Sequence, residues 1–165
     1  MTQTHVAVRR SRPVDLEGFE AFVAGLSTET STRRFFAPTT RLPRSNARLL
    51  LTNDRRRGAF LATQGDRVVA HGCWAAVAPD AAEMALVVGD AAQRRGVGRK
   101  LTRALMRDML DAGIRRMEMV VEPDNRAVVG LITRTWPDAR PRSEDGLLTF
   151  AAPTADESGG QRAVA

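Results

Sequence analysis

The chain has 165 residues, of which 43% are hydrophobic and 27% charged, a composition that suits one globular domain with a buried core. No apolar stretch reaches the roughly 18–20 residues of a membrane-spanning helix, and the N-terminus lacks the apolar segment of a secretory signal, so we expect a cytoplasmic protein with no membrane partner. The single cysteine, Cys73, excludes an intrachain disulfide and a cysteine-based zinc site, and His5 and His71 show no metal-ligand spacing, so no metal is expected.

The formal net charge of +6 comes almost entirely from arginine, because Lys100 is the only lysine. Arginine binds phosphate and carboxylate groups through its planar fork of donors, so this charge suits an anionic ligand. The arginines are scattered in pairs and triplets, aromatic residues make up 5% of the chain, and tyrosine is absent. We therefore do not expect the basic, aromatic surface that binds nucleic acids.

The first half of the chain is predicted to form a strand, helices and a hairpin. After Pro13, the residues Leu16, Phe19, Phe22 and Val23 recur at helical spacing. Gln64-Gly65-Asp66 is a typical turn between two strands. The predicted elements are a strand at 5–10, a helix at 13–26, a polar loop or broken helix at 27–40, a helix at 43–51, and strands at 58–63 and 67–76.

The second half alternates strands and helices before a final hairpin. We predict a strand at 83–88, a helix at 98–112 that ends at Gly113, a strand at 117–121, a helix from 125 to about 135, and a hairpin within 139–150, with its turn at 143–146. Hairpins with inserted helices indicate an α+β domain with a mixed, mostly antiparallel central sheet flanked by about four helices. We expect residues 1–152 to form this single domain, and the small, polar residues 153–165 to form a disordered tail.

The segment QRRGVG at 93–98 separates the predicted strand at 83–88 from the helix that follows. A glycine-rich turn at the start of a helix exposes backbone amides at the positive end of the helix dipole, which suits a phosphate or pyrophosphate. Gly96 and Gly98 also lack the Cβ atom that would hold an anion away from the backbone. The segment matches neither the Walker A pattern nor the Rossmann pattern G-x-G-x-x-G.

This segment resembles the Q/R-x-x-G-x-G/A loop of the GNAT superfamily of acyl-CoA N-acyltransferases, which binds the pyrophosphate of acetyl-CoA. The predicted order of strands and helices is also similar to the GNAT order. The segments LSTETSTRRFF (26–36), LTND (51–54) and AEMALVV (82–88) are similar to Pat-type protein lysine acetyltransferases, which acetylate acyl-CoA synthetases. The resemblance covers about residues 26–131 and implies a GNAT-like fold.

The resemblance implies an N-acetyltransferase that uses acetyl-CoA as acetyl donor and acts on an amine, first of all a protein lysine such as one on an acyl-CoA synthetase. A small-molecule amine is the alternative acceptor, and a catalytically weak CoA-binding sensor or partner-binding module is the alternative function. The oligomeric state stays open between a monomer and a homodimer. The segment 33–36 (RRFF) would either line the acceptor site or belong to the core.

The resemblance also implies roles for individual residues. The strand would offer backbone groups to the pantetheine arm, and the Val88 N–H would stabilise the oxyanion formed from the thioester. The loop amides would hold the pyrophosphate. Asn125 would contact the CoA arm, although asparagine is also a common helix N-cap. The implied cofactor-binding residues are Leu86, Val87, Val88, Gln93, Arg94, Arg95, Gly96, Val97, Gly98, Arg99 and Asn125.

Glu83 and Val88 are the implied catalytic residues. A lysine amine has a pKa near ~10.4 and must lose a proton before it attacks, and Pat-type enzymes use the Glu that matches Glu83 as general base. Glu83 precedes Val88 by five residues, or about 16 Å along a flat strand and less along a bulged one, so a water relay would help. From the residues alone, the favoured interpretation of Glu83 is a solvated residue at the start of a strand.

A general acid is missing from the pattern. Many GNAT enzymes protonate the departing thiolate with a tyrosine, and Ile132 stands at the matching position of this chain. Trp136-Pro137 likewise replaces the family's Gly-Phe ending. The thiolate would leave unassisted, since its pKa is near ~8.5, or with help from a water molecule or the Thr133 hydroxyl.

Overall fold

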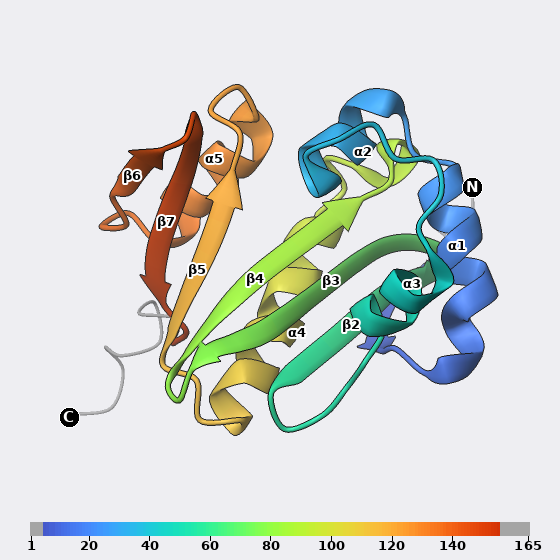
Figure 1. The fold of residues 1–165 in the computed structure, drawn as a ribbon, viewed down its shortest axis with the longest axis horizontal. Helices are drawn as coiled ribbons and strands as arrows, with labels where there is room; N and C mark the ends of the chain where they lie inside the picture. Colours follow the sequence, from blue (N-terminus) through green and yellow to red (C-terminus); the bar gives the residue numbers. More distant parts are fainter. Residues whose placement is uncertain (1–4, 156–165) are drawn as a thin grey trace.

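The computed structural model describes residues 5–155, which form a seven-stranded sheet and five α-helices (Figure 1). The strands are β1 (Val6–Arg10), β2 (Arg57–Gln64), β3 (Arg67–Ala78), β4 (Ala81–Val88), β5 (Arg116–Val121), β6 (Pro141–Glu144) and β7 (Leu147–Pro153). The helices are α1 (Leu16–Ala24), α2 (Thr28–Phe35), α3 (Arg44–Leu50), α4 (Val97–Asp111) and α5 (Arg126–Thr135). The mixed, mostly antiparallel α+β fold predicted from the sequence is confirmed. Within the described residues, no helix is long and apolar enough to span a membrane.

The sheet has the strand order β1-β2-β3-β4-β5-β7-β6, and all neighbouring strands are antiparallel except β4 and β5. These two central strands run parallel and pair only over Ala81–Glu83 with Arg116–Glu118. Beyond Glu83 they diverge, so that the sheet opens between them (Figure 1). The residues Met84–Val88 therefore have a partner strand, β3, on one side only.

Two hydrophobic cores cover the two faces of the sheet. Helices α4 and α5 contribute residues such as Leu101 and Ile132 to one core. Helices α1 and α3 pack on the other face, where the predicted residues Leu16, Phe19, Phe22, Val23 and Leu26 are all buried. Because side chains alternate along a strand, Met84 of β4 belongs to the first core and Val87 to the second.

Helix α2 occupies the segment for which the sequence predicted a polar loop or broken helix. Threonine and serine are weak helix formers, but backbone groups at both ends of this helix have hydrogen-bond partners. The Ser27 side chain accepts a hydrogen bond from the Thr30 amide at 3.2 Å, as an N-cap does. One turn later, Glu29 and Arg33 form an ion pair at 2.8 Å.

The C-terminal hairpin is longer than predicted. Ser143 and Glu144 belong to β6, and the turn lies at Asp145-Gly146, where both residues have positive φ angles of 50° and 78°. Strand β7 continues through Pro153, and the Thr154 amide donates a hydrogen bond to the Arg115 carbonyl at 3.0 Å. The sheet thus extends past the domain boundary expected at 152. Residues 156–165 of the expected tail lie outside the described residues.

Candidate active site

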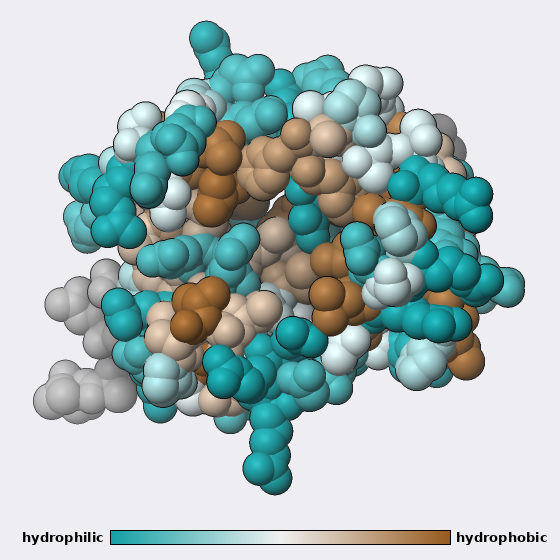
Figure 2. Space-filling view, in the orientation of Figure 1, coloured by the Kyte–Doolittle hydropathy of each residue, from teal (hydrophilic) through white to brown (hydrophobic). Residues whose placement is uncertain are grey.

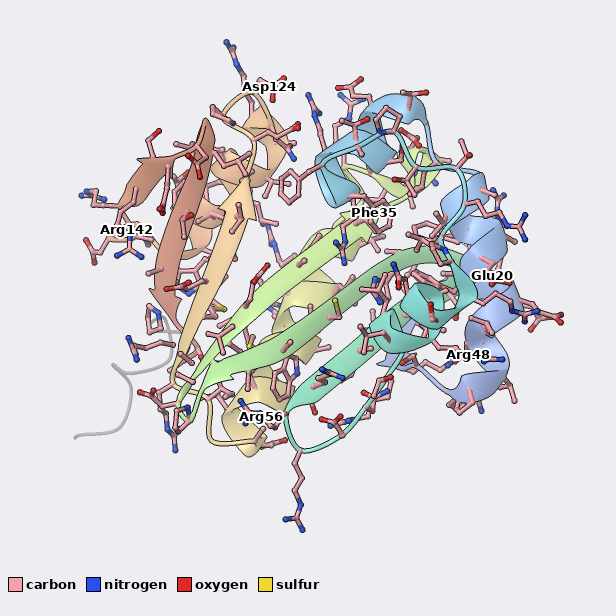
Figure 3. All side chains as sticks on the ribbon, in the orientation of Figure 1. Glu20, Phe35, Arg48, Arg56, Asp124 and Arg142 are labelled. Atoms are coloured by element: carbon pink, nitrogen blue, oxygen red, sulfur yellow. The ribbon has the colours of Figure 1, made fainter. Side chains whose placement is uncertain are left out.

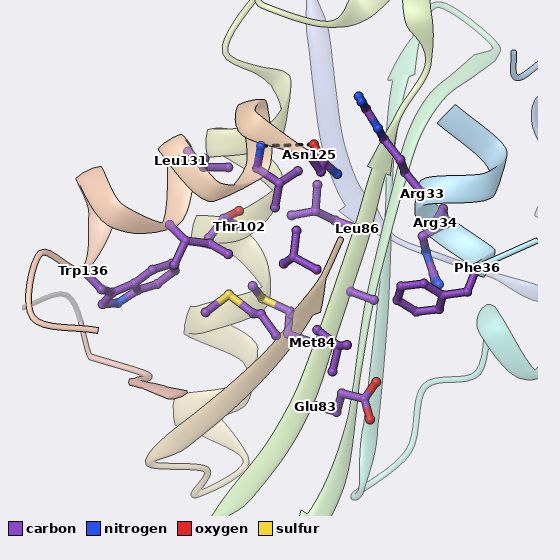
Figure 4. Close-up of a pocket in the computed structure, with 16 residues that line it drawn as sticks. Arg33, Arg34, Phe36, Glu83, Met84, Leu86, Thr102, Asn125, Leu131 and Trp136 are labelled. Carbon is purple, nitrogen blue, oxygen red and sulfur yellow. Dashed lines mark hydrogen bonds between the residues drawn. The ribbon is translucent and has the colours of Figure 1, made fainter. Parts of the chain in front are cut away.

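A cavity of about 100 Å³ lies where β4 and β5 diverge. The space-filling view shows the hollow near the centre of the molecule, with hydrophobic residues around it (Figure 2). Its walls come from both faces of the sheet. Arg34 of α2 lies on the face covered by α1 and α3, and Thr102 of α4 and Ile132 of α5 lie on the other face (Figure 4). The opening between the strands therefore connects the two faces of the sheet.

The backbone of β4 directs alternate residues toward this opening. The Gly89 amide donates to the Val69 carbonyl at 2.9 Å, which makes the pair of residues 69 and 89 a hydrogen-bonded one. Hydrogen-bonded and non-hydrogen-bonded pairs alternate along antiparallel strands. The backbone groups of Leu86 and Val88, which face Gly72 and Ala70 of β3, therefore point away from β3 and toward the opening.

Val87 does not share this arrangement. It falls in a hydrogen-bonded pair with His71 of β3, and its side chain is buried in the core beneath α1. Of the three strand residues expected to meet the cofactor, Leu86 and Val88 direct backbone groups to the opening and Val87 does not. Met84 has the same backbone orientation as Leu86, a position that the apolar run did not single out.

The glycine-rich loop lies at the C-terminal end of β4 and leads into α4. Gly96, the N-cap of α4, has a φ of 77°, a left-handed conformation that glycine adopts at low cost. A Cβ atom on Gly98 would lie 3.7 Å from a Val88 methyl group and 4.0 Å from one of Leu131. Gly98 thus marks the place where β4, α4 and α5 meet, and the first turn of α4 faces the wide end of the opening.

Four basic side chains surround this turn. Arg94, Arg95, Arg99 and Lys100 are exposed, and none forms an ion pair with another described residue. Together with the amides at the helix N-terminus, they make this end of the opening electropositive.

Gln93 serves a structural purpose at the start of the loop. Its side-chain amide donates to the Val88 carbonyl at 3.1 Å and to the Thr30 hydroxyl at 3.3 Å. Asp90 accepts hydrogen bonds from the Ser27 amide and hydroxyl and from the Thr30 hydroxyl. Burial raises the pKa of Asp90, but these hydrogen bonds outweigh it and leave the pKa below its ordinary value. The Gln93 side chain therefore fastens the loop to β4 and α2.

Glu83 occupies the narrow end of the opening. It is the last residue of β4 that pairs with β5, and its exposed side chain lines the cavity on the face that carries Phe36 and Arg34 (Figure 4). It is also the one carboxylate among the described residues that line the cavity. A base at this position can accept a proton from an amine that enters from that face.

His71 and Cys73 lie beneath the same face, and both are uncharged at neutral pH. Burial, with the positive charge of Arg34, lowers the pKa of His71 to about 3. Its Nε2 lies 2.8 Å from the Leu50 carbonyl and therefore carries the proton of the neutral ring. Burial likewise raises the pKa of the Cys73 thiol. Neither group is suited to accept a proton from a substrate amine.

The start of α5 accommodates both expected roles of Asn125. Its side chain accepts a hydrogen bond from the Val128 amide at 3.4 Å, as an N-cap does, and Asn125 also lines the cavity. Ile132 lines the cavity about two turns later and offers no proton donor.

The Thr133 hydroxyl does not face the cavity. Thr133 is exposed, and its hydroxyl donates to the Val129 carbonyl of its own helix at 3.0 Å. Thr102 of α4 provides a hydroxyl in the cavity wall instead: it is buried and has no hydrogen-bond partner among the described residues. The sequence could have indicated Thr102, because it lies one turn after Gly98 and residues i and i+4 share a helix face.

The family and the solved structures that this chain resembles in the comparisons below are acetyltransferases or acetyltransferase domains. The family described as "Acetyltransferase (GNAT) family" matches residues 25–135. The GNAT domain of Pat from Streptomyces lividans is 28% identical, with 90% of each chain covered and a TM-score of 0.82. A ribosomal-protein-alanine N-acetyltransferase from Brucella melitensis is 17% identical over 89% of this chain and 99% of its own, with a TM-score of 0.70. A ribosomal L7/L12 α-N-protein acetyltransferase in complex with coenzyme A is 14% identical over 92% and 95%, with a TM-score of 0.71. No curated protein matches.

Proposed function

The chain belongs to the GNAT family of acetyltransferases, and on that premise we propose that it transfers an acetyl group from acetyl-CoA to a protein lysine, with Glu83 as general base. The observation that carries this proposal is the opening between β4 and β5. It has backbone groups without a partner strand along one edge, an electropositive helix N-terminus at its wide end and a carboxylate at its narrow end. These are the groups that a phosphorylated donor and an amine acceptor require.

The donor fits the opening as an added strand would. The backbone groups of Leu86 and Val88 would bind the amides of the pantetheine arm, with Asn125 on the opposite wall, and the amides of residues 94–99 would bind the pyrophosphate. The buried Thr102 hydroxyl would gain a polar partner from the arm. Acetyl-CoA supplies an activated thioester whose thiolate, with a pKa near ~8.5, is a fair leaving group.

The acceptor would approach from the face that carries Glu83. The carboxylate takes a proton from the lysine ammonium through water, and the neutral nitrogen attacks the carbonyl carbon. A C–N bond forms, the C–S bond breaks, and an N–H of β4 stabilises the intermediate oxyanion. The second proton of the attacking nitrogen passes through water to the departing thiolate, which leaves as the thiol of coenzyme A. Val88 was the expected donor, but the Leu86 N–H points the same way and lies only three residues, or about 10 Å, from Glu83 along the strand. A thioester held beside Leu86 and Val88 thus shortens the water relay.

An acetyl-transfer assay tests this proposal. The protein is incubated with labelled acetyl-CoA and an acyl-CoA synthetase, and incorporated label is measured for the wild type, Glu83→Gln and Glu118→Gln. Glu118 pairs with Glu83 across β4 and β5, so its variant is a matched control. We expect transfer to fall by about 10²–10⁴-fold in Glu83→Gln alone. Equal transfer by Glu83→Gln and the wild type would refute Glu83 as the base.

Two other functions are distinguished by the same assay together with a CoA-binding measurement and a panel of small amines. Ile132 stands in the cavity where a proton donor was expected, which favours a weakly catalytic CoA-binding module. Tight CoA binding without turnover on proteins or small amines would support that function. Turnover on a panel of small amines, with none on proteins, would identify a small-molecule acetyltransferase. The cytoplasmic location and the oligomeric state stay predictions.

A further inference from the structure

The two neighbouring arginines at the end of α2 differ in their partners. Arg33 forms an ion pair with Glu29 at 2.8 Å. Arg34 forms no ion pair with any described residue and turns toward the sheet, where its Nη2 donates to the Cys73 sulfur at 3.6 Å. Its guanidinium carbon lies 5.0 Å from the centre of the Phe35 ring, and its Nε is buried without a partner among the described residues.

The groups around Arg34 do not neutralise its charge. His71 and Cys73, which lie within the electrostatic field of Arg34, are both neutral at pH 7, and the one carboxylate nearby in the cavity, Glu83, forms no ion pair with Arg34. A guanidinium offers five N–H donors, and a sulfur at 3.6 Å is a weak acceptor for one of them. Partly buried donors and an uncompensated charge cost free energy unless an acceptor satisfies them. Arg34 is therefore ready to bind an anion.

Arg34 and Glu83 line the same cavity (Figure 4). Two residue pairs between β3 and β4 give the spacing of Arg34 and Glu83 along the strands. Cys73, which Arg34 contacts, pairs with Ala85, and Ala75 pairs with Glu83. These pairs are two residues apart, or about 7 Å along the strands. An acidic side chain one or two residues from a lysine spans a similar distance, because consecutive Cα atoms are about 3.8 Å apart.

More arginines flank Glu83 on its other side. A second hollow is lined by Arg55, Arg56 and Arg57, by one carboxylate, Asp54, and by Ala75, the strand partner of Glu83, so its net charge is positive. All three arginines are exposed, and none forms an ion pair with a described residue. Figure 3 shows Phe35 and Arg56 toward opposite ends of β3 and β4, and Arg34 precedes Phe35 in the sequence. Positive charge thus stands on both sides of the carboxylate.

We infer that the acceptor is a peptide segment with acidic residues beside its lysine, and that Arg34 binds the nearest carboxylate while Arg55–Arg57 attract the others. This inference rests on the proposed function, because it assigns the face of Glu83 to the acceptor. Arg34 would fix the register of the peptide through a bidentate contact. Arg55–Arg57 would mainly raise the rate of association, as exposed charges do.

A binding measurement tests the inference separately from catalysis. Two fluorescein-labelled peptides are titrated in the presence of coenzyme A, and their anisotropy is recorded. Both carry one central lysine, flanked by glutamates in one peptide and by glutamines in the other. The proteins are the wild type, Arg34→Gln, Arg34→Lys and Arg44→Gln, the last a matched loss of charge from an exposed arginine that pairs with Glu20 on α1.

We expect the wild type and Arg44→Gln to bind the acidic peptide at least tenfold more tightly than the neutral one. Arg34→Gln should lose most of this preference, and Arg34→Lys should keep part of it, since it retains the charge without the planar fork. Equal binding of both peptides by the wild type, or an unchanged preference in Arg34→Gln, would overturn the inference. So would tight binding of free lysine with no peptide preference, which would indicate a small amino-acid acceptor. Selective binding without acetyl transfer to either peptide would refute the proposed function, and would leave only a surface that prefers acidic peptides.

Discussion

Gly98 offers a sharp test of the proposed pyrophosphate site, because one substitution should strengthen the fold and weaken the binding of coenzyme A. In Gly98→Asp, the new Cβ would make ordinary van der Waals contacts at 3.7 and 4.0 Å. An aspartate in the first turn of a helix favours the dipole by about 0.3–1 kcal/mol, and loss of a helical glycine adds up to about 1 kcal/mol. The unliganded variant should therefore be at least as stable as the wild type.

The same carboxylate would repel a bound pyrophosphate. At about 5 Å and an effective dielectric constant near 20, two unit charges interact by about 3 kcal/mol. Salt screens part of this, so we expect a loss of roughly 1.4–3 kcal/mol, or a tenfold to hundredfold rise in the Kd for coenzyme A.

Thermal unfolding with and without coenzyme A measures both effects. A ligand at 100 times its Kd stabilises the folded state by about 2.7 kcal/mol, which raises Tm by about 5–11 °C for a chain of this length. If the Kd rises a hundredfold, the same concentration contributes only about 0.4 kcal/mol. Gly98→Asn is the neutral control of equal size. Equal shifts in Tm for Gly98→Asp and Gly98→Asn would show that the pyrophosphate does not bind at the start of α4.

Three further predictions, which use four substitutions, test other parts of the structure. Thr102→Val removes a buried hydroxyl without a partner, so urea denaturation of the unliganded protein should show equal stability or a gain of up to about 1 kcal/mol, while the Kd for coenzyme A rises. Gly58→Ala would place a Cβ in collision with a carboxylate oxygen of Asp108 and should cost about 1–3 kcal/mol of stability. Gly18→Ala, where the nearest atom to the new Cβ is 3.6 Å away, should be neutral or stabilising. The pKa of His71 falls from 6.5 to about 3 on folding, so its contribution to stability is present above pH 6.5 and is lost as the pH falls toward 3. Between pH 7 and pH 5 the wild type should lose about 2 kcal/mol more stability than His71→Gln. Urea denaturation at each pH measures this, and parallel curves of unfolding free energy against pH for the two proteins would refute the burial of a neutral ring.

The elements that the sequence predicted well are those with local signals. The periodic apolar residues from Leu16 to Leu26, the turn at Gly65 and the helix stop at Gly113 each carry their own pattern, and the structure has these elements in the predicted places. Helix α2 lacked such a pattern because its stability depends on contacts far along the chain. Ser27 and Thr30 bind Asp90, which lies about 60 residues away in sequence.

The site was predictable to the extent that it depends on residues in one segment. The loop at 93–98 and the strand at 82–88 are continuous in sequence, and the structure joins them at one opening. The apolar run did not reveal which backbone groups are paired, so Val87 could not be separated from Leu86 and Val88. That difference depends on the register with β3, which is a property of two strands.

The groups missed in the sequence share a physical feature that no single segment encodes. Four buried side-chain polar atoms lack a partner among the described residues, and three of them belong to Arg34, Thr102 and Trp136, which all line the cavity. The unpaired backbone edge of β4 opens into the same space. Folded proteins pair nearly all of their buried polar groups, so unpaired groups in one place indicate a site where a ligand completes the hydrogen bonds. Under the proposed function, the donor and the acceptor would supply the missing hydrogen-bond partners along β4.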